Sequence, residues 1–209
     1  EGYFTMVTSS HSKRTTVEAV IDFMSTGLVG GIIMMAPAVS DEIKDILSKC
    51  TIPFVVINGK KDFSKTDSIN IDNYNGSFNM VEYLIKKGYK KIAHITGPKE
   101  NEDAVKRLQG FTDALKKHGL KVNKSWIVEG KFTIDSGVDC FNKIISLKEK
   151  PEVIFAGNDM MAIGCYNAAR LNKIKIPTDI AIAGFDDIFI SQYLTPRLTT
   201  INVPIYEIG

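Results

Sequence analysis

Long apolar runs are absent from this sequence of 209 residues, and with them any segment that could cross a membrane as a helix. A membrane-spanning helix needs about 20 consecutive apolar residues, and the longest apolar run here, around residues 30–36, is far shorter. The opening residues, EGYFTMVTSS, also lack the basic and apolar regions of a secretory signal peptide. We therefore expect no membrane span and no leader here, although a leader already cleaved would leave no trace.

Cysteine and histidine are scarce, with three residues of each. The cysteines lie far apart, and neither a CxxC pair nor a Cys/His cluster with zinc spacing is present. Cys140 and Cys165 fall within helical patterns, which predicts small buried residues, and reduced thiols favour a cytoplasmic protein. His94 lies inside an apolar strand, which favours a core histidine over a general base. No metal site is predicted.

The motifs of the common enzyme and cofactor classes are also missing. The sequence contains no GxSxG, GxxxxGK[ST], HExxH or GxGxxG. We therefore predict that the chain is not an enzyme and that it uses no cofactor.

What is present is an ordinary globular composition with almost no net charge. Apolar residues make up 44% of the chain and charged residues 24%, as in many soluble domains. The length allows one large domain or two modest lobes. The net charge is +2, and the basic runs KKGYKK and KKHGLK are typical of solvated helix ends. The sequence by itself carries no nucleic-acid-binding footprint.

Strand and helix patterns alternate along most of the chain. Apolar stripes at helical spacing, with capping residues before them and glycines after them, indicate helices. Apolar runs such as GGIIMMAP and IAIAG show no alternation, which favours strands covered on both faces. Strands separated by helices of about 10–15 residues imply right-handed βαβ crossovers and parallel sheets. The predicted strands are 3–8, 32–37, 54–58, 91–96, 127–128, 153–156 and 180–183, and the predicted helices 16–26, 40–50, one through 78–85, 102–118, 136–147 and 159–171, with a polar loop at 60–67.

Polar side chains follow the ends of several predicted strands. Asn58 ends FVVIN, Asn158 ends VIFAGN and Asp186 ends IAIAGFD, while Arg107 lies early in the helix after ITGP. Because open α/β sheets bind ligands at the carboxyl ends of their strands, we expect these side chains to line one cleft. A guanidinium, a carboxylate and amides suit a polyhydroxylated ligand. Phe132, in a nearby loop, would offer a flat apolar face to a sugar ring.

The same residues have structural interpretations that the pattern leaves open. Capping would account for the acidic residues, a surface ion pair for the arginine, core packing for the aromatic and an Asn-Gly turn for the asparagine. The alternatives are Asp159 as a helix N-cap, Asp186 or Asp187 as turn caps, Arg107 paired with Asp103, Phe132 in the core and Asn58 in a turn.

Three blocks of the sequence resemble the LacI/GalR family of bacterial transcriptional repressors, and together they span nearly the whole chain. IDNYNG and GYKKIAHITGP are similar to the family's D-N-x-x-G and its G-h-x-x-I-a-x-i-x-G-P. RLQGFTDALKKHGL is similar to R-x-x-G-F-x-x-A-L-x-x-x-G. The last block holds NDMMAIG, IPTDIAIAGFDD and PRLTTI, similar to N-D-x-x-A-x-G, I-P-x-D-I-x-I-x-G-F-D-D and P-x-L-T-T-i.

The resemblance implies an α/β fold of two Rossmann-like (flavodoxin-like) lobes, with parallel sheets joined by crossover strands, as in type I periplasmic binding proteins. The first, incomplete lobe would comprise residues 1–71 plus 200–209, and the second residues 72–199. The family's helix-turn-helix DNA-binding domain, hinge helix, and first strand and helix would precede this sequence. Its C-terminal helix would follow.

The family's effector contacts correspond to the residues that strand ends also indicate. By resemblance, the ligand-binding residues are Asn58, Arg107, Phe132, Asn158 and Asp186. Three positions depart from the family pattern: Val203 stands where Gln is frequent, Glu102 lies near a position often held by a small hydroxyl residue, and Asn101 stands where the purine repressor has a second arginine, which argues against a purine effector.

The implied function is that of a DNA-binding transcriptional regulator whose lobes close on a sugar or sugar derivative in the cleft between them. Closure would be transmitted to the DNA-binding domains. Expected partners are that effector, a second copy of the chain in a homodimer, and operator DNA, with no membrane partner. An alternative with the same fold is an extracytoplasmic sugar-binding protein of a transport system, although the I-P-x-D-I and P-x-L-T-T blocks favour the repressor. A flavodoxin-like enzyme, the other alternative, lacks a nucleophile–base pair.

Overall fold

The computed structural model divides the chain into two compact units, Glu1–Ile71 and Asp72–Gly209. Much of the first unit lies outside the described residues, including residues 60–66 of the loop expected at 60–67 and all but residues 46 and 49 of the helix predicted at 40–50. Asp67, the last residue of that expected loop, begins a strand instead. Of the helix predicted at 16–26, residues 18, 21 and 22 are described and helical. The structure describes residues 4–7, 18, 21–22, 27, 29–35, 46, 49, 52–58 and 67–208.

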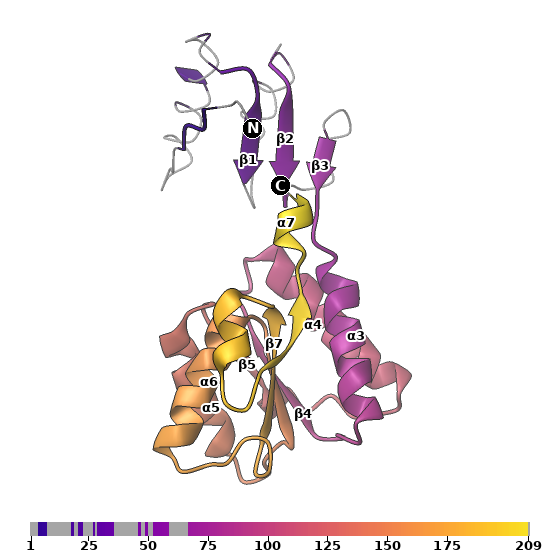
Figure 1. Ribbon diagram of the computed structural model, residues 1–209. Coiled ribbons are helices and arrows are strands. Elements are labelled where there is room, and N and C mark those ends of the chain that lie inside the picture. Colours follow the sequence, from indigo (N-terminus) through magenta and orange to yellow (C-terminus); the bar gives the residue numbers. More distant parts are fainter. Residues whose placement is uncertain are drawn as a thin grey trace. The chain divides into compact units, whose positions relative to one another are not determined.

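The first unit contains a three-stranded parallel sheet in the order β1-β2-β3 (Figure 1). Its strands are β1 (Ile32–Met35), β2 (Phe54–Ile57) and β3 (Asp67–Ile69). The predicted strands at 32–37 and 54–58 are therefore confirmed within the described residues.

Two expectations for the first unit are wrong. The strand predicted at 3–8 does not form over the described residues 4–7, which are exposed and pair with no described strand. The expectation that β1 is covered on both faces also fails. Met34 is 8% exposed, whereas its neighbours Ile33 and Met35 are 73% and 77% exposed. Alternate side chains of a strand point to opposite faces, so one face of β1 is packed and the other is open.

The second unit is built on a five-stranded parallel sheet in the order β5-β4-β6-β7-β8. The strands predicted at 91–96, 127–128, 153–156 and 180–183 are all present, and β7 runs three residues further than predicted, to Asp186. Thr199–Asn202, at the expected boundary between the two lobes, pairs with β7 along the sheet edge. The assignment of residues 200–209 to the first lobe stays a prediction. The strands are β4 (Ile92–Thr96), β5 (Ile127–Glu129), β6 (Val153–Ala156), β7 (Ala181–Asp186) and β8 (Thr199–Asn202).

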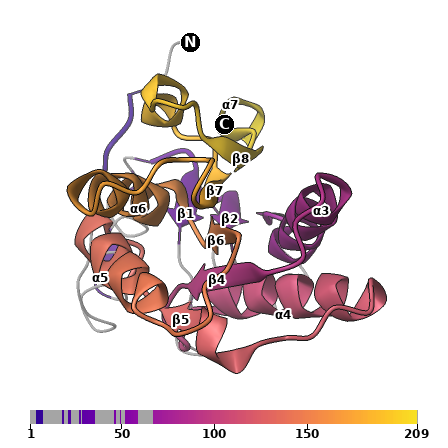
Figure 2. The ribbon, with the colours of Figure 1, turned by 90° about the horizontal axis from the view of Figure 1, so that it is seen from below.

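Helices cover both faces of this sheet. Figure 2 shows α3 and α4 on one face and α5 and α6 on the other, which gives three layers. Short helical turns η1 (Lys124–Trp126), η2 (Phe189–Tyr193) and α7 (Ile205–Ile208) complete the unit. None of the described helices is long and apolar enough to cross a bilayer. The four main helices are α3 (Asn73–Lys86), α4 (Glu102–Lys117), α5 (Ile134–Ile145) and α6 (Asp159–Leu171).

Side-chain caps fix where these helices begin. Asn101 accepts a hydrogen bond from the backbone N–H of Ala104 at 2.9 Å and starts α4, and Thr133 and Ser136 form a capping box at α5. Gly119, at φ +68°, ends α4 in the left-handed region that glycine tolerates. Local sequence therefore sets the points at which the chain passes from loop to helix beside the sheet.

One hydrophobic cluster of the second unit lies between the sheet and α5 and α6. Cys140 and Cys165 are buried there, at 2% and 0% exposure, which confirms the prediction that they are small core residues. The two helices approach closely: a Cβ on Gly164 would lie 2.1 Å from the carbonyl oxygen of Ile134. Only glycine permits this contact, so the α5–α6 pair is tightly fixed under the sheet.

The strand order places a topological switch between β4 and β6. From β4 the chain crosses to β5 on one side and then to β6 on the other. In open parallel sheets, ligands bind in the crevice at such a switch, outside the carboxyl ends of the strands. The fold of the second unit therefore points to the loops after β4, β5, β6 and β7.

Candidate ligand-binding pocket

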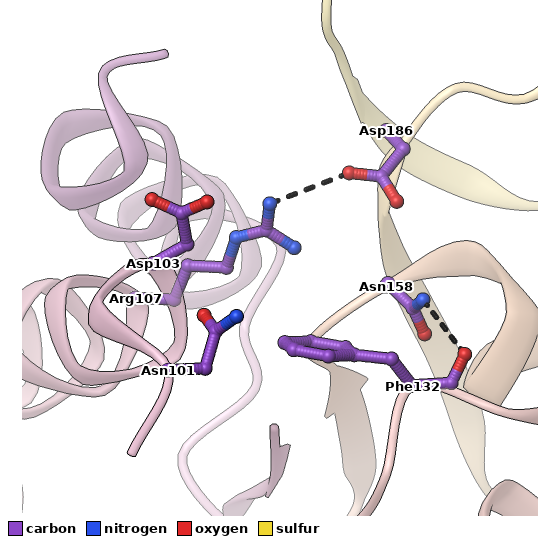
Figure 3. A pocket seen from close by; sticks show the side chains of 6 residues that line it. All are labelled: Asn101, Asp103, Arg107, Phe132, Asn158 and Asp186. Atoms are coloured by element: carbon purple, nitrogen blue, oxygen red, sulfur yellow. Dashed lines mark hydrogen bonds and ion pairs between the residues drawn. The ribbon is translucent and has the colours of Figure 1, made fainter. Parts of the chain in front are cut away.

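An open pocket lies at these carboxyl ends, within the second unit (Figure 3). The loop after β4 and the start of α4 supply three of its residues, and the segments after β5 and β6 and the end of β7 supply one each. Four of the five residues predicted to bind ligand therefore surround one pocket, as strand order indicates. The lining residues are Asn101, Asp103, Arg107, Phe132, Asn158 and Asp186.

Arg107 is the central residue of this pocket. It is only 6% exposed, so the alternative of a surface arginine is wrong. Its Nε donates to Asn73 Oδ1 at 2.7 Å, one terminal nitrogen donates to the carbonyl oxygen of Gly157, and the other lies 3.4 Å from Asp186 Oδ1. The guanidinium carbon also lies 3.8 Å from the centroid of the Phe185 ring. One side chain thus ties α4 to α3, to the loop after β6 and to the end of β7.

An asparagine on α3 connects Arg107 to the acidic wall of the pocket. Asn73 is 1% exposed, accepts from Arg107, and donates through Nδ2 to Asp103 Oδ1 at 2.8 Å. The buried face of α3 includes Val81 and Leu84, and it continues through the polar residues Asn73 and Ser77. The buried asparagine thus has hydrogen-bond partners on both sides of its amide and fixes the positions of the arginine and the aspartate relative to each other.

Asp186 closes the pocket from the end of β7. Its side chain is 27% exposed, and burial raises the pKa of its carboxyl to about 6, an increase that the nearby Arg107 opposes and Asp159 reinforces. Its backbone has φ 110°, and Phe132 and Asp187 also have positive φ values, 60° and 53°. Bulky residues seldom adopt this region, and such strain gathers where side chains are aimed at a ligand.

Phe132 and Asn158 form the opposite wall. The Asn158 amide donates to the carbonyl oxygen of Phe132 at 3.2 Å, while its oxygen accepts from the N–H of Met161 at 2.9 Å and caps α6. Asn158, and not Asp159, is therefore the N-cap. The Phe132 ring packs over Gly97, where a Cβ would lie 2.0 Å from its tip. The ring faces the pocket (Figure 3) and also touches the core cluster.

Asp159 has a structural role behind the pocket. It is fully buried and accepts from Thr200 Oγ1 at 2.6 Å and from the N–H of Ile188 at 3.0 Å. Burial raises the pKa of its carboxyl above the usual range. Asp187, the turn-cap alternative, accepts from the Ser191 hydroxyl at 3.2 Å and from Asn202 at 2.9 Å. These two carboxylates hold β8 and the turn that follows β7 against the end of β7.

Two residues singled out by the sequence do not line this pocket. Asn58 belongs to the first unit and has φ 55°, a value that asparagine adopts in turns. Its side-chain oxygen accepts from the N–H of Ile71 at 3.3 Å. Val203 is 7% exposed, and its N–H donates to the carbonyl oxygen of Asp186 at 3.3 Å. The role of Asn58 in ligand binding stays a prediction.

Asn101 and Asp103 line the pocket although neither was predicted as a binding residue. Both have an obvious helical reason to be present, as the N-cap and a first-turn acid of α4. Glu102, the position singled out by resemblance, is exposed, and the next residue faces the pocket instead. Helical spacing supplies a signal, because residues 103 and 107 are one turn apart and share a face.

His94 has no catalytic geometry. It is fully buried between the rings of Phe111 and Phe155, its Nδ1 lies 2.8 Å from the carbonyl oxygen of Phe155, and its Nε2 has no partner among the described residues. Burial lowers the pKa of its imidazole to about 4, so it is neutral at physiological pH. No described group of His, Cys, Asp and Glu residues is arranged to hold a metal ion.

Comparison with known proteins agrees with the fold. Residues 81–209 match the periplasmic binding protein-like domain. The chain is 36% identical over 182 residues to catabolite control protein A of Priestia megaterium, a match that covers 87% of this chain and 55% of that protein. The chain thus spans little more than half the length of this relative.

Solved structures give the same result. A LacI-family regulatory protein from Chloroflexus aggregans is 31% identical, with a TM-score of 0.86 over 95% of this chain and 71% of that one. A LacI-family transcriptional regulator from Enterococcus faecium with bound ribose is 28% identical, with a TM-score of 0.81 over 92% of this chain and 71% of that one. The chain therefore belongs to the periplasmic binding protein-like domain family, within the LacI/GalR family of transcriptional regulators.

Proposed function

We propose that this chain is the effector-binding region of a LacI/GalR-type transcriptional repressor and that its pocket binds a sugar or sugar derivative. The observation that carries the proposal is the convergence of Arg107, Phe132, Asn158 and Asp186 on one pocket at the strand switch. Donors, acceptors and an aromatic face in one place suit a polyhydroxylated ring. The ribose bound by the Enterococcus faecium regulator supports the same ligand class.

The pocket residues take different parts in this proposal. Asp186 accepts from ligand hydroxyls and the Phe132 ring packs against the sugar. Arg107 donates through N–H groups that its protein partners leave unused, because a guanidinium has more N–H groups than the three bonds described above. Asn158 has both ends of its amide in protein hydrogen bonds and acts mainly by positioning Phe132. Asn58 is a further contact on the strength of the family resemblance alone.

The regulatory mechanism that we propose follows the family. Residues 1–71 plus 200–209 and residues 72–199 act as two lobes whose closure responds to the ligand, and the change reaches DNA-binding domains in a homodimer on operator DNA. The protein acts in the cytoplasm and is not an enzyme. A transport-associated sugar-binding protein fits less well, since the relatives named above are regulatory proteins.

A thermal-shift screen of the full-length protein against pentoses, hexoses, disaccharides and nucleosides tests the ligand class. A ligand that binds only the native state stabilises the folded protein by about 2.7 kcal/mol when its concentration is 100 times the Kd. Calorimetry on the strongest binder should then show that Asp186→Asn loses at least ~1.5 kcal/mol of affinity, because a charge-assisted hydrogen bond is replaced by a neutral one.

Asp139→Asn is the matched control, since it removes an exposed carboxylate from α5, away from the pocket. It should bind with wild-type affinity. If Asp186→Asn binds as tightly as the control, the site is misplaced. If no sugar or nucleoside stabilises the protein, the proposed ligand class is wrong.

A further inference from the structure

The charges around the pocket are unbalanced toward the negative. One guanidinium, that of Arg107, faces two carboxylates, those of Asp103 and Asp186, and the other three lining residues are uncharged. The formal charge of the lining is therefore +1 − 2 = −1. No lysine and no second arginine lines the pocket among the residues that the structure describes.

The single positive charge is already engaged by the protein. All three nitrogens of the Arg107 guanidinium have protein partners, and the plane of the group lies against Phe185. Its pKa is lowered by burial, and neighbouring carboxylates oppose the effect. A phosphate bound in the usual bidentate way needs two parallel N–H groups on one edge of a guanidinium. Here each of those nitrogens already has a protein partner, in Asn73, Gly157 or Asp186, so an anion would have to share them with the protein.

The acceptors, in contrast, are only half used. Asp103 Oδ1 accepts from Asn73 and Asp186 Oδ1 faces Arg107, while the Oδ2 atoms accept from no residue in the described part of the chain. The side-chain oxygen of Asn101 caps α4, while its amide N–H groups donate to no residue in the part of the chain that the structure describes. The pocket thus offers two carboxylate oxygens to hydroxyl donors and one amide to a ligand oxygen. A phosphate or carboxylate ligand would place its own hydrogen-bond acceptors against the carboxylate acceptors of the pocket.

We propose, on the basis of the function proposed above, that this pocket selects uncharged polyhydroxy ligands and rejects their phosphorylated or carboxylated forms, with Asp103 as the residue that sets this selection. Asp103 is suited to the role because it lies on the first turn of α4 and accepts one described hydrogen bond. Asp186, by comparison, forms an ion pair with the buried Arg107, so a substitution of Asp186 would also remove a contact of that arginine. Changing Asp103 therefore alters the pocket's charge with the least effect on the fold.

Matched pairs of ligands provide the test. The full-length protein is titrated by calorimetry with ribose and ribose 5-phosphate, glucose and glucose 6-phosphate, and a nucleoside and its 5′-monophosphate, with inorganic phosphate as a separate probe. In every pair that binds, the uncharged member should bind more than about tenfold tighter, because like charges brought together in a desolvated site are strongly unfavourable. Asp103→Asn and Asp103→Ser should narrow that ratio at least ~fivefold.

The outcomes separate this inference from the function on which it rests. If a phosphorylated member binds as tightly as its uncharged partner, or if both Asp103 variants keep the wild-type ratio, charge selection is refuted while sugar binding stands. If no pair binds at all, the proposed function fails, and the inference fails with it. Circular dichroism of the Asp103 variants, with Asp139→Asn as the control, shows whether a changed ratio comes from a folded protein.

Discussion

Removal of the Arg107 guanidinium should destabilise the second unit even without any ligand. In Arg107→Met the acceptors Asn73 Oδ1 and Gly157 O lose their donor, and both residues are buried. Each buried acceptor left unsatisfied costs roughly 1–3 kcal/mol, which gives about 2–6 kcal/mol in total. The pair with Asp186 adds little, because it is 3.4 Å long and Asp186 is 27% exposed.

Relief of the buried charge and partial filling by methionine oppose this loss, so we expect a net cost of about 3 kcal/mol. Trp126 is the only tryptophan of the chain, is 6% exposed and belongs to the core of the second unit. Its fluorescence therefore reports unfolding of that unit. With an m-value of roughly 2 kcal/mol per M, the urea midpoint should fall by about 1.5 M.

Arg170→Met is the control, because Arg170 is exposed on α6. It should change stability by less than about 0.5 kcal/mol. If the midpoint of Arg107→Met lies within ~0.3 M of the wild type, or if both variants fall equally, the buried guanidinium does not hold these elements together.

Two further predictions concern the pocket walls. Because burial raises the folded-state pKa of Asp186 to about 6, ionisation of this group costs more in the folded state than in the unfolded state. The ligand-free wild type should therefore lose stability relative to Asp186→Asn as pH rises from about 4 to about 6. Urea midpoints of both proteins across this window test the sign, and a constant difference contradicts it. Gly97→Ala should weaken sugar binding at least ~threefold, or about 0.6 kcal/mol, because the new Cβ would lie 2.0 Å from the Phe132 ring and displace it. Unchanged affinity by calorimetry would show that the ring does not contact the ligand.

The second unit follows closely from local sequence signals. Its helices are bracketed by caps and stops, as α4 is by Asn101 and Gly119, and its strands are short apolar runs between them. The first unit follows less well. The exposed face of β1 and the irregular backbone at 4–7 depend on which segments pack nearby. An apolar run does not specify which other segments will pack against it.

The candidate site shows the same division between position and role. Arg107, Asn158 and Asp186 could be assigned to one cleft because polar residues after parallel strands meet at the same edge. The separate role of each residue could not be predicted. The Asn158 side chain, for example, bonds to both Met161 and Phe132 only because of its orientation in the folded protein. The sequence did not identify Asp103 as a pocket residue, because an acidic residue in the first turn of a helix is already explained by the helix itself. Whether its side chain faces the pocket depends on how α4 is rotated about its axis against the sheet.

The ties of Arg107 to α3, to the loop after β6 and to the end of β7 have a consequence for how this protein can diverge. A substitution there would destabilise the unit whether or not it favoured a new ligand. Asp103 has one described hydrogen bond and stands on a helix that is capped independently by Asn101. In the proposed site, ligand preference and structural integrity thus depend on different side chains of one pocket, one turn of helix apart. New specificities can then be reached by single substitutions on the first turn of α4, without a compensating change in the core.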